Sequence, residues 1–363
     1  MLTDERISTR QLIFLLFCLA IGSMLFTLPK MMINQAQQDV WLVLLLSLFF
    51  DSCFGVIIYV LSLRHPNQTM VQYCETLFGK WLGKLAGLVF VIYFAGISIQ
   101  ILMVVVDYLA TVMMPETPKL AFSLLILLIC AYTVDAGLEV IARVSEVIAP
   151  VIVGSLCLII TLSINNVHLE YLEPVFQHTF GEIVQSSFLP TTWLGNLIVA
   201  GMLLPQHNNK HKTLLAILAA TTAIVVGLMI ILVETIAVIG VNLSSTQIYP
   251  IYRLVQMISV GDFLEHVESL LVIIWVAGSF IGVILTNYCS TLGLEQVTGL
   301  THKHRLLTII NGGVLLLVTT LAFPSVAARQ YFVVNTLPYL TIMVEGLLLG
   351  LLLLVSLLRL RQS

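Results

Sequence analysis

Two stretches of sequence, Gly22-Ser23-Met24 and Pro190-Thr191-Thr192-Trp193-Leu194-Gly195-Asn196, decide the fold of this 363-residue chain. Each lies near the middle of an apolar segment that is long enough to cross a bilayer. A helix inside a bilayer must satisfy its own backbone hydrogen bonds, so glycine, proline and small polar residues at mid-span indicate a break that lines a cavity. The two stretches lie about 170 residues apart, close to half the chain. Paired breaks in spans 1 and 6 are typical of a five-plus-five inverted repeat with its binding site between them.

The composition indicates a membrane protein. Apolar side chains make up 59% of the chain and charged ones only 10%, and the mean hydropathy is +1.05. These values exclude a water-soluble globular protein. Ten windows each hold about 18 or more mostly apolar residues, enough to cross a hydrocarbon core of about 30 Å, which predicts an all-α polytopic protein with ten transmembrane helices. We expect the spans at about 11–33, 40–62, 82–113, 120–137, 145–165, 186–204, 213–241, 264–288, 306–323 and 335–358.

The distribution of lysine and arginine predicts that both termini are cytoplasmic, because translocated loops carry few positive charges. Twelve of the 16 basic residues fall in segments that this orientation places inside, and four fall outside. The inner ones are Arg6, Arg10, Arg64, Lys80, Lys84, Arg143, Lys210, Lys212, Lys303, Arg305, Arg359 and Arg361, and the outer ones are Lys30, Lys119, Arg253 and Arg329. The net charge of −3 and the scattered basic residues indicate no nucleic-acid partner.

The connecting segments are short, at most about 25 residues, which is too few for an ordinary soluble domain. We therefore expect one transmembrane domain, 1–363, with inverted repeats at about 8–165 and 180–323 and a peripheral helix, 335–358, counted with the second repeat.

Two longer outer loops, 166–185 and 242–263, form short interfacial helices, an outer lid or plain polar connectors. No cluster of histidines and carboxylates has metal-ligand spacing within a span, so we expect neither an enzyme nor a cofactor. The six cysteines show no C-x-x-C pair and no disulfide framework, and we expect all of them to be reduced.

Breaks of this kind suit a small zwitterion such as an amino acid. The N–H groups at a half-helix start attract an anionic group, and unwound carbonyl groups accept an ammonium group. Spans 3 and 8 supply further small or polar residues at mid-depth. The candidate ligand-binding residues are Gly22, Ser23, Met24, Gly96, Gln100, Thr191, Thr192, Trp193, Gly195, Ile284 and Tyr288. Taken singly, each is more readily interpreted as a helix-packing residue, and only the paired breaks favour a binding site.

Acidic residues inside the spans are a second functional signal, because a charge at mid-bilayer costs at least a few kcal/mol. Asp51 in span 2 and Glu345 in span 10 lie deepest. Three more lie nearer the outer face, where Arg253 or Arg329 is placed to pair with them: Asp107, Glu234 and Glu268.

A sodium site is a weaker hypothesis. Thr286 and Ser290 stand at i and i+4 on span 8 and would present two hydroxyl groups toward span 1. Hydroxyl groups in such positions more commonly bond to the backbone of their own helix, so we expect no metal at this place unless the hydroxyls are free.

A series of short motifs follows in order along nearly the whole chain. They are Ile7-Ser8-Thr9-Arg10-Gln11-Leu12, Gly22-Ser23 with Leu28-Pro29, Asp39-Val40-Trp41, Arg64-His65-Pro66, Leu77-Phe78-Gly79-Lys80-Trp81-Leu82-Gly83-Lys84, Pro115-Glu116-Thr117-Pro118, Gly137-Leu138-Glu139-Val140-Ile141-Ala142-Arg143, Leu203-Leu204-Pro205, and Leu264-Glu265-His266-Val267-Glu268 before Ile274-Trp275. In this order the motifs resemble the B subunits of nutrient germinant receptors of endospore-forming bacteria, a branch of the amino acid–polyamine–organocation superfamily.

The resemblance implies a leucine-transporter-like fold whose central site, between helices 1, 3, 6 and 8, binds a small nutrient, often an amino acid. It implies two protein partners, an A subunit and a lipoprotein C subunit, in the spore inner membrane. Family members resemble receptors more than pumps. The chain departs from related sequences at Met24, where permeases of the superfamily usually have glycine, at Asn196, where an acid is common, and at His266, where arginine is common.

Three functions remain open from the sequence. The first is a nutrient-sensing receptor subunit, in which binding moves one helix bundle against the other and partner subunits detect the movement. The second is a sodium- or proton-coupled secondary transporter of amino acids. The third is a water or ion conduit, since the same breaks are able to line a hydrated pore.

Overall fold

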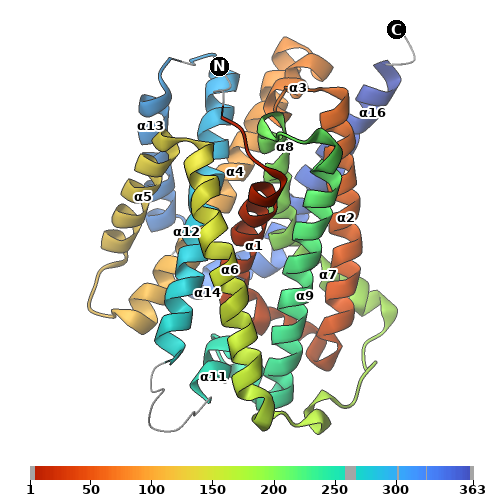
Figure 1. Cartoon of the computed structure of the whole chain (residues 1–363), viewed down its shortest axis with the longest axis vertical. Coiled ribbons are helices and arrows are strands. Elements are labelled where there is room, and N and C mark those ends of the chain that lie inside the picture. The colour runs from red at the N-terminus through yellow and green to blue at the C-terminus, as the bar shows by residue number, and fades with distance from the viewer. Residues whose placement is uncertain (1–4, 258–266, 301, 324, 360–363) are drawn as a thin grey trace.

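The computed structural model describes residues 5–257, 267–300, 302–323 and 325–359. Over this part of the chain it is a bundle of helices, and the only paired extended segments form an isolated bridge between Ile7 and His207 (Figure 1). Within the described ranges, nine helical stretches are long and apolar enough to span a membrane. The first of them, Thr9–Arg64, contains two helices that run in opposite directions, so the described chain crosses ten times, as the sequence predicts.

Ten crossings build the bundle, and shorter helices connect them. The crossings are α1 (Thr9–Ala36), α2 (Val40–Arg64), α4 (Lys80–Tyr108), α5 (Lys119–Ala136), α6 (Leu138–Ser163), α7 (Phe180–Leu194) with its continuation to Gln206, α9 (Thr213–Ile239), α12 (Val267–Thr298), α13 (His304–Leu321), and α15 (Leu337–Thr341) continued by α16 (Leu349–Arg359). The short helices are α3 (Met70–Phe78), α10 (Val241–Thr246), α11 (Pro250–Gln256) and α14 (Val326–Asn335).

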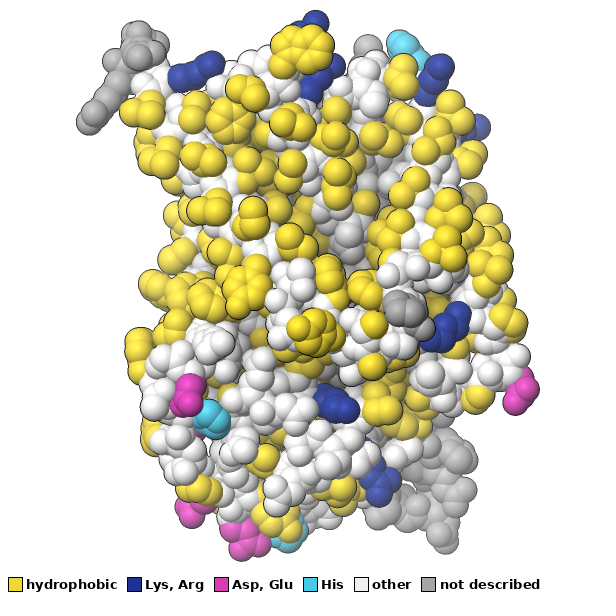
Figure 2. All heavy atoms as spheres, turned by 180° about the vertical axis from the view of Figure 1, so that it is seen from behind, with side chains coloured by type: hydrophobic (Ala, Val, Ile, Leu, Met, Phe, Trp, Pro, Cys, Tyr) yellow, Lys and Arg dark blue, Asp and Glu magenta, His cyan; other side chains and the backbone are white. Residues whose placement is uncertain are grey.

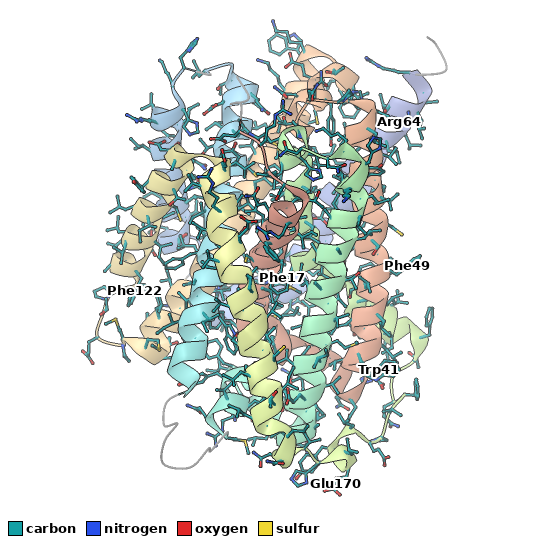
Figure 3. The ribbon with its side chains drawn as sticks, in the orientation of Figure 1. Phe17, Trp41, Phe49, Arg64, Phe122 and Glu170 are labelled. Atoms are coloured by element: carbon teal, nitrogen blue, oxygen red, sulfur yellow. The ribbon has the colours of Figure 1, made fainter. Side chains whose placement is uncertain are left out.

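Both described ends of the chain lie at one end of the bundle, which we call the terminal end (Figure 1). The other end, with α10 and α11, is called the opposite end. Phe17 is buried within the bundle, whereas Phe49 is 62% exposed on its side (Figure 3). On the face shown in Figure 2, hydrophobic side chains cover the middle of the bundle, and Lys and Arg side chains lie along the edge of the terminal end and also toward the opposite end. Apolar sides with polar ends suit a bilayer, and the chain is a multi-pass membrane protein.

α6 and α12 extend furthest beyond the spans that the hydropathy predicts. α6 begins at Leu138 rather than near 145, and α12 ends at Thr298 rather than near 288. The extra turns are polar and amphipathic. Glu139 and Arg143 form an i,i+4 ion pair on the first turns of α6 (2.5 Å), and Glu295 near the end of α12 pairs with His304. Such turns are stabilised by charge pairing outside the apolar window, so hydropathy alone misses them.

Short helical turns occupy the described parts of the two outer loops. The first loop holds the 3-10 turn Leu169–Leu172, and the second holds α10 and α11. The Leu264-Glu265-His266 motif lies outside the described residues, as does the side chain of Glu268. The described parts of the loops therefore combine short helical turns with an irregular stretch, residues 173–179, and the choice between interfacial helices, a lid and plain connectors stays a prediction.

The predicted break in helix 1 is wrong. α1 remains an α-helix through Gly22, Ser23 and Met24. A Cβ atom on Gly22 would lie 2.7 Å from the carbonyl carbon of Gly278, so the missing side chain lets α1 and α12 approach closely. The Ser23 hydroxyl donates to the carbonyl of Ala20 in its own helix (3.4 Å). Gly22 and Ser23 therefore act as helix-packing residues, which is the alternative to a ligand site that the sequence analysis gave for each of them.

The predicted break in helix 6 is confirmed. α7 contains Pro190 and ends at Leu194, and the chain continues as a 3-10 helix over Gly195–Val199. One α turn, Ala200–Leu203, and a second 3-10 turn, Leu204–Gln206, complete the crossing. A 3-10 segment inside a helix often marks a functional hinge, because its hydrogen bonds have poorer geometry than those of an α-helix.

Candidate ligand-binding site

A cavity of about 460 Å³ lies beside the 3-10 segment of helix 6 and opens at the side of the bundle, where Ile92 is 62% exposed; we call it the central cavity. Its walls come from α4, the region of Thr192 and Asn196, the end of α13, α14 and α15. This volume is typical of a pocket for a small molecule. The walls are mostly apolar. The polar side chains that line them are Tyr93, Gln100, Thr192, Asn196, Arg329 and Thr341.

Four buried polar atoms around the central cavity have no hydrogen-bond partner within the described residues. They are Nε2 of Gln100, both amide atoms of Asn196, and Nε of Arg329. Asn196 is 1% exposed and Arg329 is 8% exposed. Each unpaired buried polar atom costs about 1–3 kcal/mol, and a polar ligand that reached these atoms would remove that cost.

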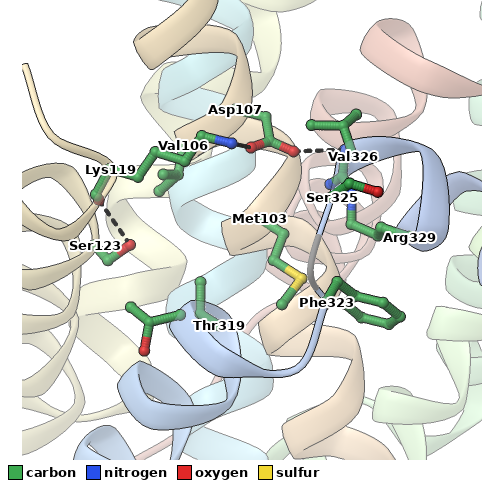
Figure 4. Close-up of a pocket in the computed structure, with 11 residues that line it drawn as sticks. Met103, Val106, Asp107, Lys119, Ser123, Thr319, Phe323, Ser325, Val326 and Arg329 are labelled. Atoms are coloured by element: carbon green, nitrogen blue, oxygen red, sulfur yellow. Dashed lines mark hydrogen bonds and ion pairs between the residues drawn. The ribbon is translucent and has the colours of Figure 1, made fainter. Parts of the chain in front are cut away.

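Arg329 links the central cavity to two further cavities toward the opposite end. One, of about 380 Å³, is lined by Asp107 and Lys119 (Figure 4), and the other, of about 260 Å³, is lined by Lys30 and Tyr249. Asp107 accepts from Lys119 at 2.6 Å and from Arg329 at 2.7 Å. Pairing between Asp107 and Arg329 was one of the two arrangements that the sequence predicts, and it is confirmed.

Tyr249 lies in the connection between α9 and α12, where burial raises the pKa of its phenol above the ordinary value. Its ring also contacts Tyr108 and Phe26, with ring centroids 5.1 Å and 6.3 Å away. The phenol therefore stays neutral, and the wall of this cavity combines aromatic surface with the positive charges of Lys30 and Arg329.

Only part of the sequence-predicted residue set lines the central cavity. Gly96, Gln100 and Thr192 line it. A Cβ atom on Gly96 would meet nothing within 4 Å, so this glycine leaves open space. Thr191 and Gly195 face another group instead. The Thr191 hydroxyl donates to Asp51 (3.3 Å), and a side chain on Gly195 would collide with the Glu345 carboxyl group.

The remaining candidates pack elsewhere. Gly22, Ser23 and Met24 lie in the contact region of α1, and Trp193 is buried with 1% exposure. Ile284 and Tyr288 lie on α12, both nearly buried. The Tyr288 hydroxyl accepts from the Gln206 amide (3.2 Å), at the end of helix 6 nearer the termini.

The two hydroxyls of the sodium hypothesis already have partners. Thr286 donates to the carbonyl of Gly282 (2.8 Å), and Ser290 donates to the Asn311 amide oxygen (3.2 Å). Among the described residues no group of three or more His, Cys, Asp or Glu side chains is arranged to hold a metal ion.

At the terminal end the N-terminal segment bonds to the end of helix 6, an arrangement we call the latch. The N–H of Ile7 donates to the carbonyl of Gln206 (2.9 Å), and the N–H of Asn208 donates to the carbonyl of Ile7 (3.0 Å). His207 lies against Thr9 and Thr213, with ring nitrogens 3.1 Å and 2.8 Å from their hydroxyls. Burial, reinforced by the charge of Lys210, lowers the pKa of His207 from 6.5 to about 4, so the ring is neutral near pH 7.

The sequence analysis did not predict that Asn196, Arg329 and Tyr93 line the same cavity. Tyr93, Gly96 and Gln100 stand at i, i+3 and i+7 on α4, a spacing that places them on one helix face. That signal was in the sequence. The approach of Arg329 from α14 was not, because it depends on tertiary packing.

Fold and cavity together define a helical membrane protein with a transporter-like fold. Two solved structures share the fold. One is Mhp1, a nucleobase-cation-symport-1 family transporter, in a closed conformation with bromovinylhydantoin bound, with a TM-score of 0.69 and 12% identity. The other is a substrate-bound, outward-open Na⁺-coupled sialic acid symporter, with a TM-score of 0.68 and 14% identity. Each match covers 96% of this chain and 78% of the other, and the transporter-like fold predicted from the sequence is confirmed.

Similar sequences narrow the class. A family model described as spore germination protein matches residues 6–326. The chain is 27% identical to spore germination protein YndE of Bacillus subtilis over 301 residues, which cover 81% of each chain. It is 25% identical to spore germination protein KB of the same organism over 323 residues, 87% of this chain and 85% of the relative. The chain belongs to the spore germination protein family, and it is a germinant-sensing or transporter-like membrane protein, not an enzyme.

Proposed function

We propose that this protein is the nutrient-sensing B subunit of a spore germinant receptor and that it binds a small amino acid in the central cavity. Membership of the spore germination family supports the receptor role. The observation that carries the ligand site is Asn196, whose two amide atoms are buried and unpaired among the described residues, beside a cavity of about 460 Å³.

The cavity suits a zwitterion. Arg329 Nε and Gln100 Nε2 are unpaired donors for a carboxylate, and Asn196 Oδ1 is an unpaired acceptor for an ammonium group. A charge-assisted hydrogen bond from arginine is stronger than a neutral one. The other walls, which include Ile97 and Val344, are apolar and favour a small aliphatic side chain. The site predicted between helices 1, 3, 6 and 8 is therefore proposed in a shifted form, with helices 9 and 10 in place of 1 and 8.

The ligand reaches the cavity from the opposite end. The two cavities lined by Asp107 and by Lys30 lie on that side, and Arg329 lines both of them as well as the central cavity. The latch lies at the terminal end. By the excess of lysine and arginine there, we propose that the terminal end is cytoplasmic and that the protein lies in the spore inner membrane. Ligand binding then biases helix 6, and the A subunit and the lipoprotein C subunit detect its movement.

The test is a binding screen on the purified full-length chain, using thermal shifts against the twenty amino acids, common sugars and nucleosides. The key variant is Gly96→Leu, because a Cβ atom at Gly96 meets nothing within 4 Å and the longer side chain extends from a wall of the cavity. The matched control is Gly154→Leu on α6, where a Cβ atom also meets nothing within 4 Å but no cavity wall is formed. We expect a ligand-induced shift in the wild type and in the control and none in Gly96→Leu. An equal shift in all three proteins would refute the site.

A second candidate is a sodium- or proton-coupled amino-acid transporter. The fold shared with two transporters favours it. Its test is uptake of labelled amino acid into liposomes under an imposed sodium or proton gradient. Accumulation that depends on the gradient, without any partner subunit, would favour transport over sensing alone.

A further inference from the structure

Two carboxyl groups from distant parts of the chain meet at the helix 6 break, on the other side of Asn196. Asp51 comes from α2 and is 4% exposed, and Glu345 comes from the π-helical segment Ile342–Leu348 and is 1% exposed. Both line a small cavity of about 10 Å³, room for at most one water molecule. The carboxyl group of Glu345 occupies the space that a side chain on Gly195 would fill.

Among the described residues, no cationic side chain pairs with either acid. The described residues that line the small cavity include no Lys, Arg or His. The polar groups that face the acids are Thr191 of α7, which donates to Asp51 (3.3 Å), and Tyr93 of α4, which donates to Glu345 (2.8 Å). Thr341 of α15 lies behind them, with its hydroxyl 3.2 Å from that of Tyr93.

Each acid has one oxygen without a partner among the described residues, Oδ1 of Asp51 and Oε2 of Glu345. Two neighbouring carboxylates in an apolar site cannot both carry a charge without a large cost, and a single proton between them removes most of it. An unpaired buried oxygen on each side provides the acceptors for that proton. A sodium ion would need several more oxygen ligands than this cavity offers.

We propose that Asp51 and Glu345 form a proton-binding site that holds one exchangeable proton and controls the hinge of helix 6. The site does not depend on the nutrient, so it goes beyond the proposed receptor function. Its link to the hinge is direct, because Gly195, the first residue of the 3-10 segment, packs on Glu345, and the next residue, Asn196, faces the central cavity. Tyr93 gives a second link, since it lines the central cavity and donates to Glu345.

Loss of the proton leaves two negative charges around Gly195. Their repulsion separates α2 from the π-helical segment and removes the packing that holds the 3-10 segment. π-helical turns within longer helices are frequent at functional sites, which agrees with a place where helix 10 changes shape. The proton passes to the water that enters as the pair separates.

The test is infrared difference spectroscopy on the full-length chain in lipid nanodiscs as the pH is raised. We expect a carboxylic-acid carbonyl band equal to one proton per chain to disappear in the wild type. The double variant Asp51→Asn with Glu345→Gln, whose amides match the protonated acids in shape, loses this band. The control is Glu234→Gln, a buried acid of α9 that bonds to Ser163 and lies outside the pair. It keeps the band.

Other results would overturn the proposal. A band that persists in the double variant comes from different acids. A band that stays constant at every pH in the wild type, and is absent from the double variant, identifies a permanently protonated structural pair. A band displaced by sodium chloride but not by choline chloride at constant pH identifies a sodium site.

The coupling to helix 6 has its own readout. Trp193 lies two residues before Gly195. With the other tryptophans replaced by phenylalanine, its fluorescence should shift as the wild type titrates and stay constant in the double variant. A titrating band with unchanged Trp193 fluorescence would overturn the coupling. These readouts need no nutrient, so failure here is distinct from failure of the receptor proposal.

Discussion

Replacing Asn196 with leucine should make the protein more stable and less sensitive to its nutrient. The amide of Asn196 is 1% exposed and both of its polar atoms lack partners among the described residues. One unpaired buried polar atom costs about 1–3 kcal/mol, so a leucine of similar shape should raise the free energy of unfolding by about that amount. In the ligand complex the amide would supply one hydrogen bond of about 1 kcal/mol, and its loss weakens binding about 5-fold.

The control is the same substitution at a buried asparagine whose amide is satisfied. Asn311 is 6% exposed, donates to Asn287 (2.7 Å) and accepts from Ser290 (3.2 Å). Asn311→Leu leaves those partners unpaired and should lower the free energy of unfolding by about 1–3 kcal/mol. Melting curves in detergent give the stabilities, and the nutrient dose-response of spores gives the sensitivity. A lower melting temperature for Asn196→Leu would show that the amide is satisfied in the native protein, and an unchanged dose-response would remove it from the ligand site.

Three further predictions concern a helix contact, the latch and the ligand site. Gly22→Ala should lower the free energy of unfolding by about 1–3 kcal/mol, because its Cβ would meet the α12 backbone, whereas Gly154→Ala should not destabilise; melting curves of both check this. The pKa of His207 in the folded protein, about 4, lies below its ordinary 6.5, so the stabilisation by the neutral ring is complete above pH 6.5 and is lost as the pH falls toward 4. The difference in free energy of unfolding between wild type and His207→Asn should therefore decrease over that range. A difference that stays constant would refute the neutral ring. Arg329→Gln should abolish ligand-induced thermal shifts while the apo protein still folds, because the acid it pairs with keeps its lysine; retained shifts would exclude Arg329 from the site.

The number and order of the spans follow from the sequence because each bilayer crossing needs its own apolar window. Hydropathy misplaces the start of α6 and the end of α12 because the turns there are charged. At α6, for example, pairing between Glu139 and Arg143 stabilises turns that hydropathy assigns to a loop. The change of geometry in helix 6 was predictable because it does not depend on charged turns outside the apolar window. Its glycine and proline lie inside a window where no loop is expected, so they predict a local change of helix geometry, which the structure contains.

Gly22 and Gly195 show why the site was only half predictable. Both are mid-span glycines, and the sequence gives no reason to treat them differently. Gly22 faces the backbone of α12, and its missing side chain allows close packing. Gly195 faces the carboxyl group of Glu345, a residue 150 positions later in the chain. Only the tertiary structure decides which neighbour stands opposite a glycine, and therefore whether it packs two helices or forms part of a site.

Helix 6 connects the central cavity to the latch, and its geometry sets the size of the movement available. Gly195–Val199 is a 3-10 helix of five residues. A 3-10 helix rises about 2.0 Å per residue and an α-helix about 1.5 Å, so conversion of this segment to α-helix would shorten helix 6 by about 2.5 Å. That movement is enough to break the hydrogen bonds that Gln206 makes to Ile7 (2.9 Å) and Tyr288 (3.2 Å).

The free energy that holds the end of helix 6 in place and the free energy that ligand binding supplies are of similar size. Four hydrogen bonds hold the end of helix 6: two between backbone groups of Ile7 and residues 206 and 208, one between Thr9 and His207, and one between Gln206 and Tyr288 of α12, worth about 1 kcal/mol each. A ligand that makes three new hydrogen bonds to Gln100, Asn196 and Arg329 in only one state supplies about 3 kcal/mol, a shift of about 150-fold in the equilibrium. A state populated at about 1% would then become the majority. The contacts in this one helix are thus sufficient for a nutrient at the central cavity to release the latch at the terminal end, where partner subunits would detect it.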